Sequence, residues 1–366
     1  MKYMFILLAL IGMSSCEDFL DINENPNVAT RPPLAGLLAV ATYQTGINQF
    51  RVGSNTSFYT QYLASPNAGL GNDVYEQVDL SGTWNSVYDI MSDIFDLIQF
   101  AEEEGSTELV GVGKLLMAAN LGLLVDLWGN VPYSDAFTGT NIIPTYDDAQ
   151  GLYSTALSLI AEGRADIQRE NSTSTIAKNE KSDFLLGGKK DNWLKFSYAL
   201  EARYLNHFSK QGSYNPSAIL AAVSNSFATS AEQAQVIAFE VRNPWANTAR
   251  NNANLVLGGW LSEQFVDALN GTTFGVVDPR LEKITTPLPD GTSYVGTPNG
   301  AGRRGDGTKK VETYLDNSRA YASDNSPLFV FTFAELKFIE AEAALASNPT
   351  RALEAFLQAS THTWRI

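Results

Sequence analysis

The chain has 366 residues, of which 44% are hydrophobic and 11% aromatic, so it can bury a core and is not a disordered tail. It carries 25 Lys and Arg against 40 Asp and Glu, and the resulting net charge of −15 disfavours nucleic acid and anionic lipid headgroups as partners. A single cysteine excludes an internal disulfide framework and a multi-cysteine metal site, and two histidines argue against histidine-rich zinc sites and Ser-His-Asp chemistry.

The first residues have the layout of a bacterial lipoprotein signal. Lys2 precedes an apolar run, Tyr3–Met13, that is too short for the ~20 residues of a bilayer-spanning helix. Two serines then lead to Cys16, the lone cysteine of the chain. We therefore predict a signal peptide over residues 1–15, acyl chains on Cys16, and a Pro/Asn-rich tether over residues 16–33. The alternative is a plain secretory signal that ends in an incidental cysteine.

Residues 34–366 are predicted to form a single, mostly α-helical domain, because no linker divides them and no clean repeat is visible. Apolar residues recur at helical spacing in most segments, whereas the stretch from Gly271 to Asn325 is turn-rich and polar. A further helix is expected to begin within Ala352–Gln358. The other predicted helices are Leu34–Phe50, Trp84–Glu103, Leu109–Leu127, Tyr146–Gln168, Asn192–Lys210, Pro216–Asn225, Ser262–Asn270 and Phe333–Ser347.

Residues 300–305 spell the pattern G-x-G-x-x-G, which in dinucleotide-binding proteins turns a strand into a helix. The residues that follow, Asp306–Lys309, do not start a helix, and no alternation of strands and helices surrounds them. We therefore interpret this segment as a mobile basic loop and predict no nucleotide cofactor.

Catalytic patterns are also missing from the sequence, including Gly-x-Ser-x-Gly, His-Glu-x-x-His and the P-loop. Acidic pairs such as Asp147/Asp148 and Glu340/Glu342 leave a glycoside hydrolase open as an alternative, because that chemistry needs only two well-placed acids. In so acidic a chain we interpret these pairs as solvated helix faces, and His207, beside an apolar stripe, as structural. The sequence thus predicts a protein that is not an enzyme and has no metal or cofactor.

Aromatic residues in loops rich in Asn and Gly are the candidate ligand contacts. A sugar ring stacks its apolar C–H face on Trp or Tyr, and amide and carboxylate groups bind its hydroxyls. Core packing is the alternative role for any one of these aromatic residues. The predicted ligand-binding residues are Tyr62, Asn67, Asn72, Asp73, Tyr75, Trp245 and Trp260.

Several stretches, taken in chain order, resemble the SusD/RagB family of Bacteroidetes outer-membrane lipoproteins, and together they span nearly the whole chain. They are EDFLDIN and NPN (residues 17–27), DLWGNVPYSDAF (126–137), WLKF (193–196), ARYL (202–205), DPRL (278–281) and FAELKFIEAEA (333–343).

The resemblance implies a mostly α-helical SusD-like fold, with tetratricopeptide-like helix pairs and an irregular, loop-rich ligand-binding portion. It also implies a lipoprotein on the outer face of the outer membrane that caps a SusC-type TonB-dependent transporter and binds glycans, or peptides in some branches, without hydrolysing them. The acidic residues after Cys16 are similar to the signal for that outer face. Family members continue with more helices after the segment that matches 333–343, so we expect this chain to lack a C-terminal part of the fold.

Our leading hypothesis is a lipid-anchored cell-surface protein that captures an oligosaccharide or polysaccharide and delivers it to such a transporter. Three alternatives remain open: a peptide-binding member of the same system, a secreted glycoside hydrolase with an unrecognised acid pair, and a purely structural lid on the transporter.

Overall fold

The computed structural model describes residues 31–69, 71–253, 259–306 and 309–365. The chain separates into two units, Met1–Pro33 and Leu34–Ile366, and the description below concerns the second. The predicted signal peptide, Cys16 and nearly all of the tether lie outside the described residues.

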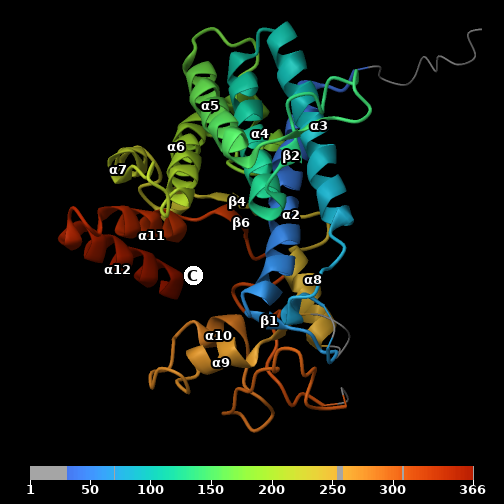
Figure 1. Ribbon diagram of the computed structural model, residues 1–366, viewed down its shortest axis with the longest axis vertical. Coiled ribbons are helices and arrows are strands. Elements are labelled where there is room, and N and C mark those ends of the chain that lie inside the picture. Colours follow the sequence, from blue (N-terminus) through green and yellow to red (C-terminus); the bar gives the residue numbers. More distant parts are fainter. Residues whose placement is uncertain (1–30, 70, 254–258, 307–308, 366) are drawn as a thin grey trace, which may run out of the picture. The chain divides into compact units, whose positions relative to one another are not determined.

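Helices dominate the described chain, as the sequence predicted (Figure 1). Packing follows chain order: α2 contacts α3, α3 contacts α4, α4 contacts α5, α5 contacts α6, and α11 contacts α12. Neighbours in sequence thus become neighbours in space, which is the arrangement expected of tetratricopeptide-like pairs. The helices are α2 (Leu34–Tyr59), α3 (Ser81–Glu103), α4 (Thr107–Trp128), α5 (Ala149–Gln168), α6 (Lys190–His207), α7 (Pro216–Ser224), α8 (Pro244–Ala253), α9 (Glu263–Leu269), α10 (Leu281–Ile284), α11 (Phe333–Ala344) and α12 (Pro349–Arg365).

Helix α4 forms the centre of the main core. By length and composition it is apolar enough to cross a membrane, but its apolar residues are nearly all buried against the neighbouring helices, so it serves here as a core helix. Glycine lets α5 approach it closely, because a Cβ atom on Gly111 would lie 2.4 Å from the carbonyl oxygen of Gly163.

Three short antiparallel strand pairs join distant segments: β1 (Leu63–Ala64) with β5 (Trp260–Leu261), β2 (Val131–Pro132) with β3 (Tyr146–Asp147), and β4 (Ala234–Val236) with β6 (Leu328–Phe331). The first pair organises a second, smaller core below the C-terminal end of α2. Its buried members are Leu63, Ala249, Leu261, Val266, Leu315 and Ala322.

The structure extends one predicted helix, shortens another and adds a third. Helix α2 continues to Tyr59, nine residues beyond the prediction of Phe50. The helix predicted from Tyr146 begins only at Ala149, because Tyr146 and its neighbour pair with β2 and the Asp148 side chain then caps the helix. Helix α8 was not predicted, because its sequence PWANTARNNA is mostly polar and rich in Asn. The turn-rich stretch from 271 to 325 is confirmed: α10 is its only α-helix among the described residues.

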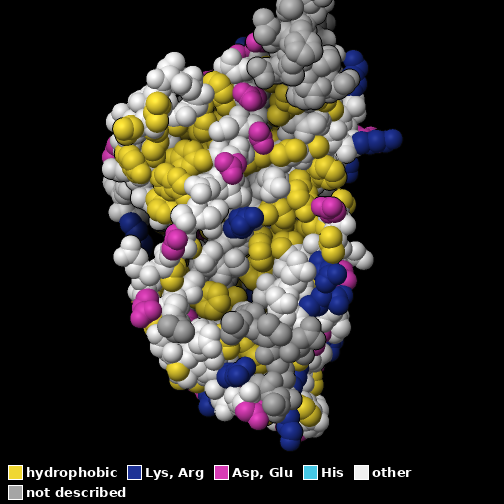
Figure 2. Space-filling model, turned by 90° about the vertical axis from the view of Figure 1, so that its right-hand side faces the viewer, with side chains coloured by type: hydrophobic (Ala, Val, Ile, Leu, Met, Phe, Trp, Pro, Cys, Tyr) yellow, Lys and Arg dark blue, Asp and Glu magenta, His cyan; other side chains and the backbone are white. Residues whose placement is uncertain are grey.

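Hydrophobic side chains also reach the surface. On the face shown in Figure 2, the α3 side of Figure 1, they gather in broad areas with acidic side chains between them. Ile142 and Ile143, in the loop between β2 and β3, are almost fully exposed. Exposed apolar areas of this kind are typical of surfaces that contact a partner.

Candidate functional site

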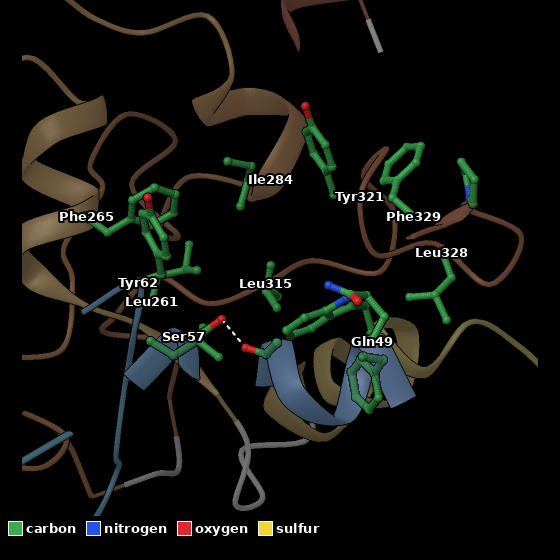
Figure 3. A pocket seen from close by; sticks show the side chains of 15 residues that line it. Gln49, Ser57, Tyr62, Leu261, Phe265, Ile284, Leu315, Tyr321, Leu328 and Phe329 are labelled. Atoms are coloured by element: carbon green, nitrogen blue, oxygen red, sulfur yellow. Dashed lines mark hydrogen bonds between the residues drawn. The ribbon is translucent and has the colours of Figure 1, made fainter. Parts of the chain in front are cut away.

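A pocket of about 450 Å³ opens between the C-terminal half of α2 and the irregular portion of the fold (Figure 3). Its walls are mainly apolar, and none of the described residues that line it is charged. Tyr62 and Phe265 lie on one side, Tyr321 and Phe329 on the opposite side, and Leu315 between them. The aromatic lining residues are Phe50, Tyr62, Trp245, Phe265, Tyr321 and Phe329.

One face of α2 forms a wall of the pocket. Phe50, Gly53 and Ser57 recur at intervals of three and four residues, so they share one face of the helix. Trp245 meets this face from the first turn of α8, and its ring lies edge-on to Phe50 with centroids 4.8 Å apart. Asn243, fully buried, holds that turn: its side-chain oxygen accepts from Trp245 N at 2.7 Å.

Tyr62 stands at the mouth of the pocket. Its ring is 53% exposed and meets Phe265 of α9 edge-on, with centroids 4.9 Å apart. Its carbonyl accepts from Ser262 N at 3.1 Å beside the β1–β5 pair, which fixes the backbone at this point. A ring held in this way offers a pre-formed apolar face to a ligand.

Tyr75 forms a second exposed aromatic surface, in the loop between α2 and α3. It is 64% exposed and lies 6.1 Å from the Tyr59 ring. Two hydrogen bonds of 3.2 Å hold the pair, from Tyr75 Oη to the Tyr59 carbonyl and from Tyr59 Oη to the Glu76 carbonyl. Asn67 is exposed in the same loop, and Asn72 is half-buried, with its amide donating to the Asn55 carbonyl at 3.3 Å.

Two predicted ligand contacts are buried, and we assign both to the fold. Trp260 is 1% exposed because β5 pairs on both sides and its ring packs edge-on against Tyr314. Asp73 is 2% exposed, and its Oδ2 accepts from Ser65 N at 2.7 Å and from Gly300 N at 3.2 Å. Neither side chain offers surface to a ligand.

The glycine-rich segment 300–305 is hydrogen-bonded to the loop that follows β1. This contact corrects the interpretation of the segment as a mobile basic loop. Gly69 N donates to the Gly300 carbonyl at 2.9 Å, and Arg303 N donates to the Pro66 carbonyl at 3.1 Å. Gly302 has a φ of +74°, and a Cβ atom there would lie 2.6 Å from Ala68 N. These glycines therefore serve close loop packing, and no helix begins in the described residues that follow, 306 and 309–327, to bind phosphate.

The DPRL motif lies near the pocket. The Arg280 side chain donates to both carboxylate oxygens of Asp278, at 3.0, 3.2 and 2.6 Å, and these hydrogen bonds hold the pKa of Asp278 below its ordinary value. Arg280 also lies near Tyr62 and Tyr321 of the pocket. The motif thus supports the segment that leads into α10.

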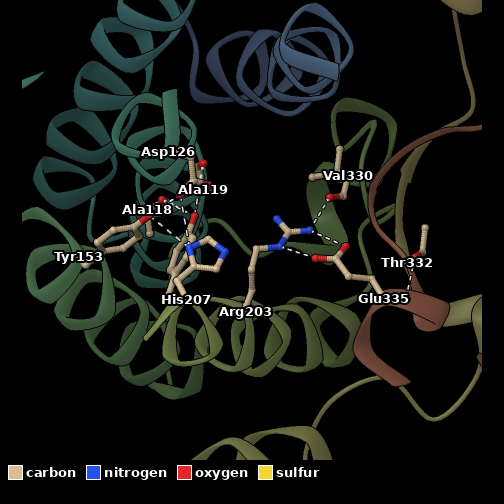
Figure 4. Close-up of polar contacts among 10 residues, drawn as sticks. Ala118, Ala119, Asp126, Tyr153, Arg203, His207, Val330, Thr332 and Glu335 are labelled. Carbon is tan, nitrogen blue, oxygen red and sulfur yellow. Dashed lines mark hydrogen bonds and ion pairs between the residues drawn. The ribbon is translucent and has the colours of Figure 1, made fainter. Parts of the chain in front are cut away.

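Other motif residues tie the helices together (Figure 4). Arg203 of α6 donates to both carboxylate oxygens of Glu335 in α11, at 2.7 and 2.8 Å, and to the Val330 carbonyl at 3.0 Å. His207 Nδ1 lies 3.3 Å from Asp126 Oδ1, which agrees with the structural role predicted for this histidine.

The acidic pairs named as hydrolase candidates are engaged in the scaffold. Asp147 accepts from Tyr133 N, Ser134 N and Ser134 Oγ, each at 2.8 Å. Glu340 pairs with Lys337 at 2.8 Å and with Arg351 at 2.7 Å. Within the described residues, no group of three or more His, Cys, Asp or Glu side chains is placed to hold a metal ion.

The chain is thus a mostly helical protein with an aromatic-lined pocket between α2 and the irregular portion of the fold. The SusD-like family described as "Starch-binding associating with outer membrane" matches residues 26–364, and the chain belongs to this family.

Solved structures share the fold. A SusD/RagB family protein from Bacteroides thetaiotaomicron matches with a TM-score of 0.72 and 22% identity, over 90% of this chain and 71% of that one. A chitin-binding SusD homologue from Flavobacterium johnsoniae matches with a TM-score of 0.73 and 18% identity, over 91% and 70% of the two chains. A SusD homologue from Bacteroides vulgatus matches with a TM-score of 0.70 and 18% identity, over the same shares. No match was found among curated proteins.

Sequence reasoning found Tyr62 and Trp245 but missed the other aromatic residues of the pocket. Phe50 is the last residue of a predicted helix, and the pocket-lining residues Gly53 and Ser57 lie in the part of α2 beyond that prediction. Phe265, Tyr321 and Phe329 lie in separate segments and carry no local signal, because the tertiary structure alone brings them together.

Proposed function

We propose that this protein binds oligosaccharides at the aromatic surface around the pocket, with Tyr62 and Trp245 at the pocket and Tyr75 on the neighbouring loop. The observation that carries the proposal is an exposed, rigidly held Tyr62 at the mouth of an uncharged aromatic pocket. The family description and the chitin-binding homologue support a glycan as the ligand class.

Sugar binding at such a surface rests on stacking and on amide hydrogen bonds. A stacked aromatic ring contributes roughly 0.5–1.5 kcal/mol beyond its buried area. Asn67 adds an exposed amide in the same loop as Tyr75. Several weak contacts of this kind suit capture and release of a cargo better than tight retention.

The proposal includes attachment through acyl chains on Cys16, a position on the outer face of the outer membrane, and delivery of the glycan to a SusC-type TonB-dependent transporter. The net charge of −15 supports the need for a lipid anchor, because charge alone does not hold this chain at an anionic surface. The exposed apolar areas near α3 support a protein partner.

Binding without hydrolysis is the favoured outcome. No carboxylate is found among the lining residues that the structure describes, whereas glycoside hydrolysis commonly uses two acids about 5–9.5 Å apart across the scissile bond. Turnover of any glycan by the purified chain, abolished by one Asp or Glu substitution, would favour the hydrolase alternative instead.

The test is isothermal titration of the purified chain with chito-, malto- and xylo-oligosaccharides and with a set of peptides. We expect one glycan series to bind, and Tyr62→Ala and Tyr75→Ala to weaken it roughly three- to tenfold each, as the loss of one stacked ring implies. The matched control is Tyr146→Ala, since Tyr146 is similarly exposed but stacks on Trp84 in another part of the fold. Binding of peptides and of no glycan would contradict the proposal, and so would equal losses in all three variants.

A further inference from the structure

The interior of the pocket is chemically unlike a sugar. Beyond its mouth it is lined by aliphatic and aromatic side chains, among them Leu261, Ile284, Leu315 and Leu328. A sugar ring buried there would leave several hydroxyls without partners, and each unpaired hydroxyl opposes binding.

Polar groups inside the pocket are few and mostly engaged. Ser57 Oγ donates to the Gly53 carbonyl at 2.6 Å, within its own helix. Tyr321 Oη donates to the Thr363 carbonyl at 3.2 Å. The Gln49 amide reaches toward the middle of the pocket (Figure 3) and makes no hydrogen bond to the described part of the chain.

We propose that the pocket binds a planar apolar group, an aryl or aromatic acyl substituent, carried by the glycan whose sugar rings stack at the mouth. The inference rests on the proposed function, since it assigns a second part of the same ligand. The volume of about 450 Å³ lies within the range of small-molecule pockets, roughly 300–1,000 Å³.

The walls suit a flat aromatic guest. Two edge-to-face pairs, Phe50 with Trp245 and Tyr62 with Phe265, line it with interplanar angles of 86° and 76°. Such pairs present both ring faces and ring edges, so a planar guest can stack on one ring and meet another edge-on. The Gln49 amide can then donate to the carbonyl of an ester or accept from a phenolic hydroxyl.

Tyr62 connects the two parts of the ligand. Its ring lines the pocket and is also half exposed at the mouth, so it can contact the sugar and its substituent together. The pocket therefore selects decorated glycans over plain ones, because only the decorated ligand displaces water from the apolar interior.

The test compares matched ligand pairs by isothermal titration: chitobiose, maltotriose and xylobiose, each against its 4-nitrophenyl glycoside. The wild-type chain is expected to bind the aryl glycoside of its preferred sugar at least tenfold more tightly than the plain sugar. Gly53→Leu places a side chain in the pocket, and it is expected to reduce the ratio of the two affinities, aryl glycoside against plain sugar, to about one. A Cβ atom on Gly53 meets only Trp245, at 3.9 Å, so Gly53→Ala is the matched control and should keep the gain.

A second measurement does not depend on the Leu variant folding. The nitrophenyl group quenches nearby indoles, so the aryl glycoside should quench tryptophan fluorescence in the wild type and clearly less in Trp245→Phe. Equal affinities within each pair, a gain that persists in Gly53→Leu, or quenching unchanged in Trp245→Phe would overturn the inference and leave the proposed glycan binding standing. Failure of every sugar to bind, plain or substituted, would overturn the proposed function itself.

Discussion

Replacing Arg203 with Met is expected to destabilise the fold strongly, because this one side chain joins α6 to both β6 and α11. The guanidinium makes two hydrogen bonds to Glu335, a third to the Val330 carbonyl, and lies 4.0 Å from the centre of the Phe331 ring. Only 15% of the Arg203 side chain is exposed, against 37% for Glu335.

The magnitude follows from these contacts. Removing one partner of a buried ion pair costs about 3–5 kcal/mol, since the other charge is left unpaired. Water can still reach Glu335, so the lower end applies, and we expect a loss of about 3 kcal/mol in the free energy of unfolding. Met fills much of the same volume, which separates the lost polar contacts from a simple cavity.

Urea unfolding of the wild type and variants, with linear extrapolation to water, measures this loss. Arg250→Met is the matched control, because Arg250 makes a similar two-armed pair with Asp324 but both side chains are about 40% exposed. An exposed pair of that kind contributes at most about 1 kcal/mol. If both variants lost the same stability, the argument that burial makes the Arg203 pair important would be refuted.

Two further outcomes follow from the packing and the charges. Gly111→Ala should lower the free energy of unfolding by on the order of 2 kcal/mol, because the added Cβ would force α4 away from the Gly163 carbonyl. The control Gly82→Ala, whose Cβ would meet nothing within 4 Å, should be neutral or slightly stabilising. Equal urea midpoints for the two variants would contradict this prediction. The pKa of Asp278 is held below its ordinary value by hydrogen bonds from Arg280, so the stability it contributes is present above about pH 4 and is lost as the pH falls through the lowered pKa. Asp278→Asn should therefore show a shallower loss of stability on acidification from pH ~5 to ~2, and parallel curves for variant and wild type would contradict the assignment.

The helical scaffold could be predicted from the sequence, because apolar residues at intervals of three and four mark the buried face of a helix within a short segment. Helices α3, α6 and α11 lie close to their predicted ranges for this reason, and α4 does so because it is a long, mostly apolar segment that is buried on nearly all sides. The family motifs indicated the fold class, and two of their residues, Arg203 and Glu335, join α6 to α11 in this structure.

The binding surface was decided only by the tertiary structure. Trp245 and Trp260 look alike in the sequence, each in a short polar or glycine-rich stretch, yet one lines the pocket and the other is buried. The difference arises because Trp260 lies in β5, and β5 pairs with β1, which is 196 to 198 residues away in the chain. This pairing buries Trp260. The exposure of an aromatic side chain depends on such long-range pairing, which cannot be predicted from the neighbouring residues in the sequence.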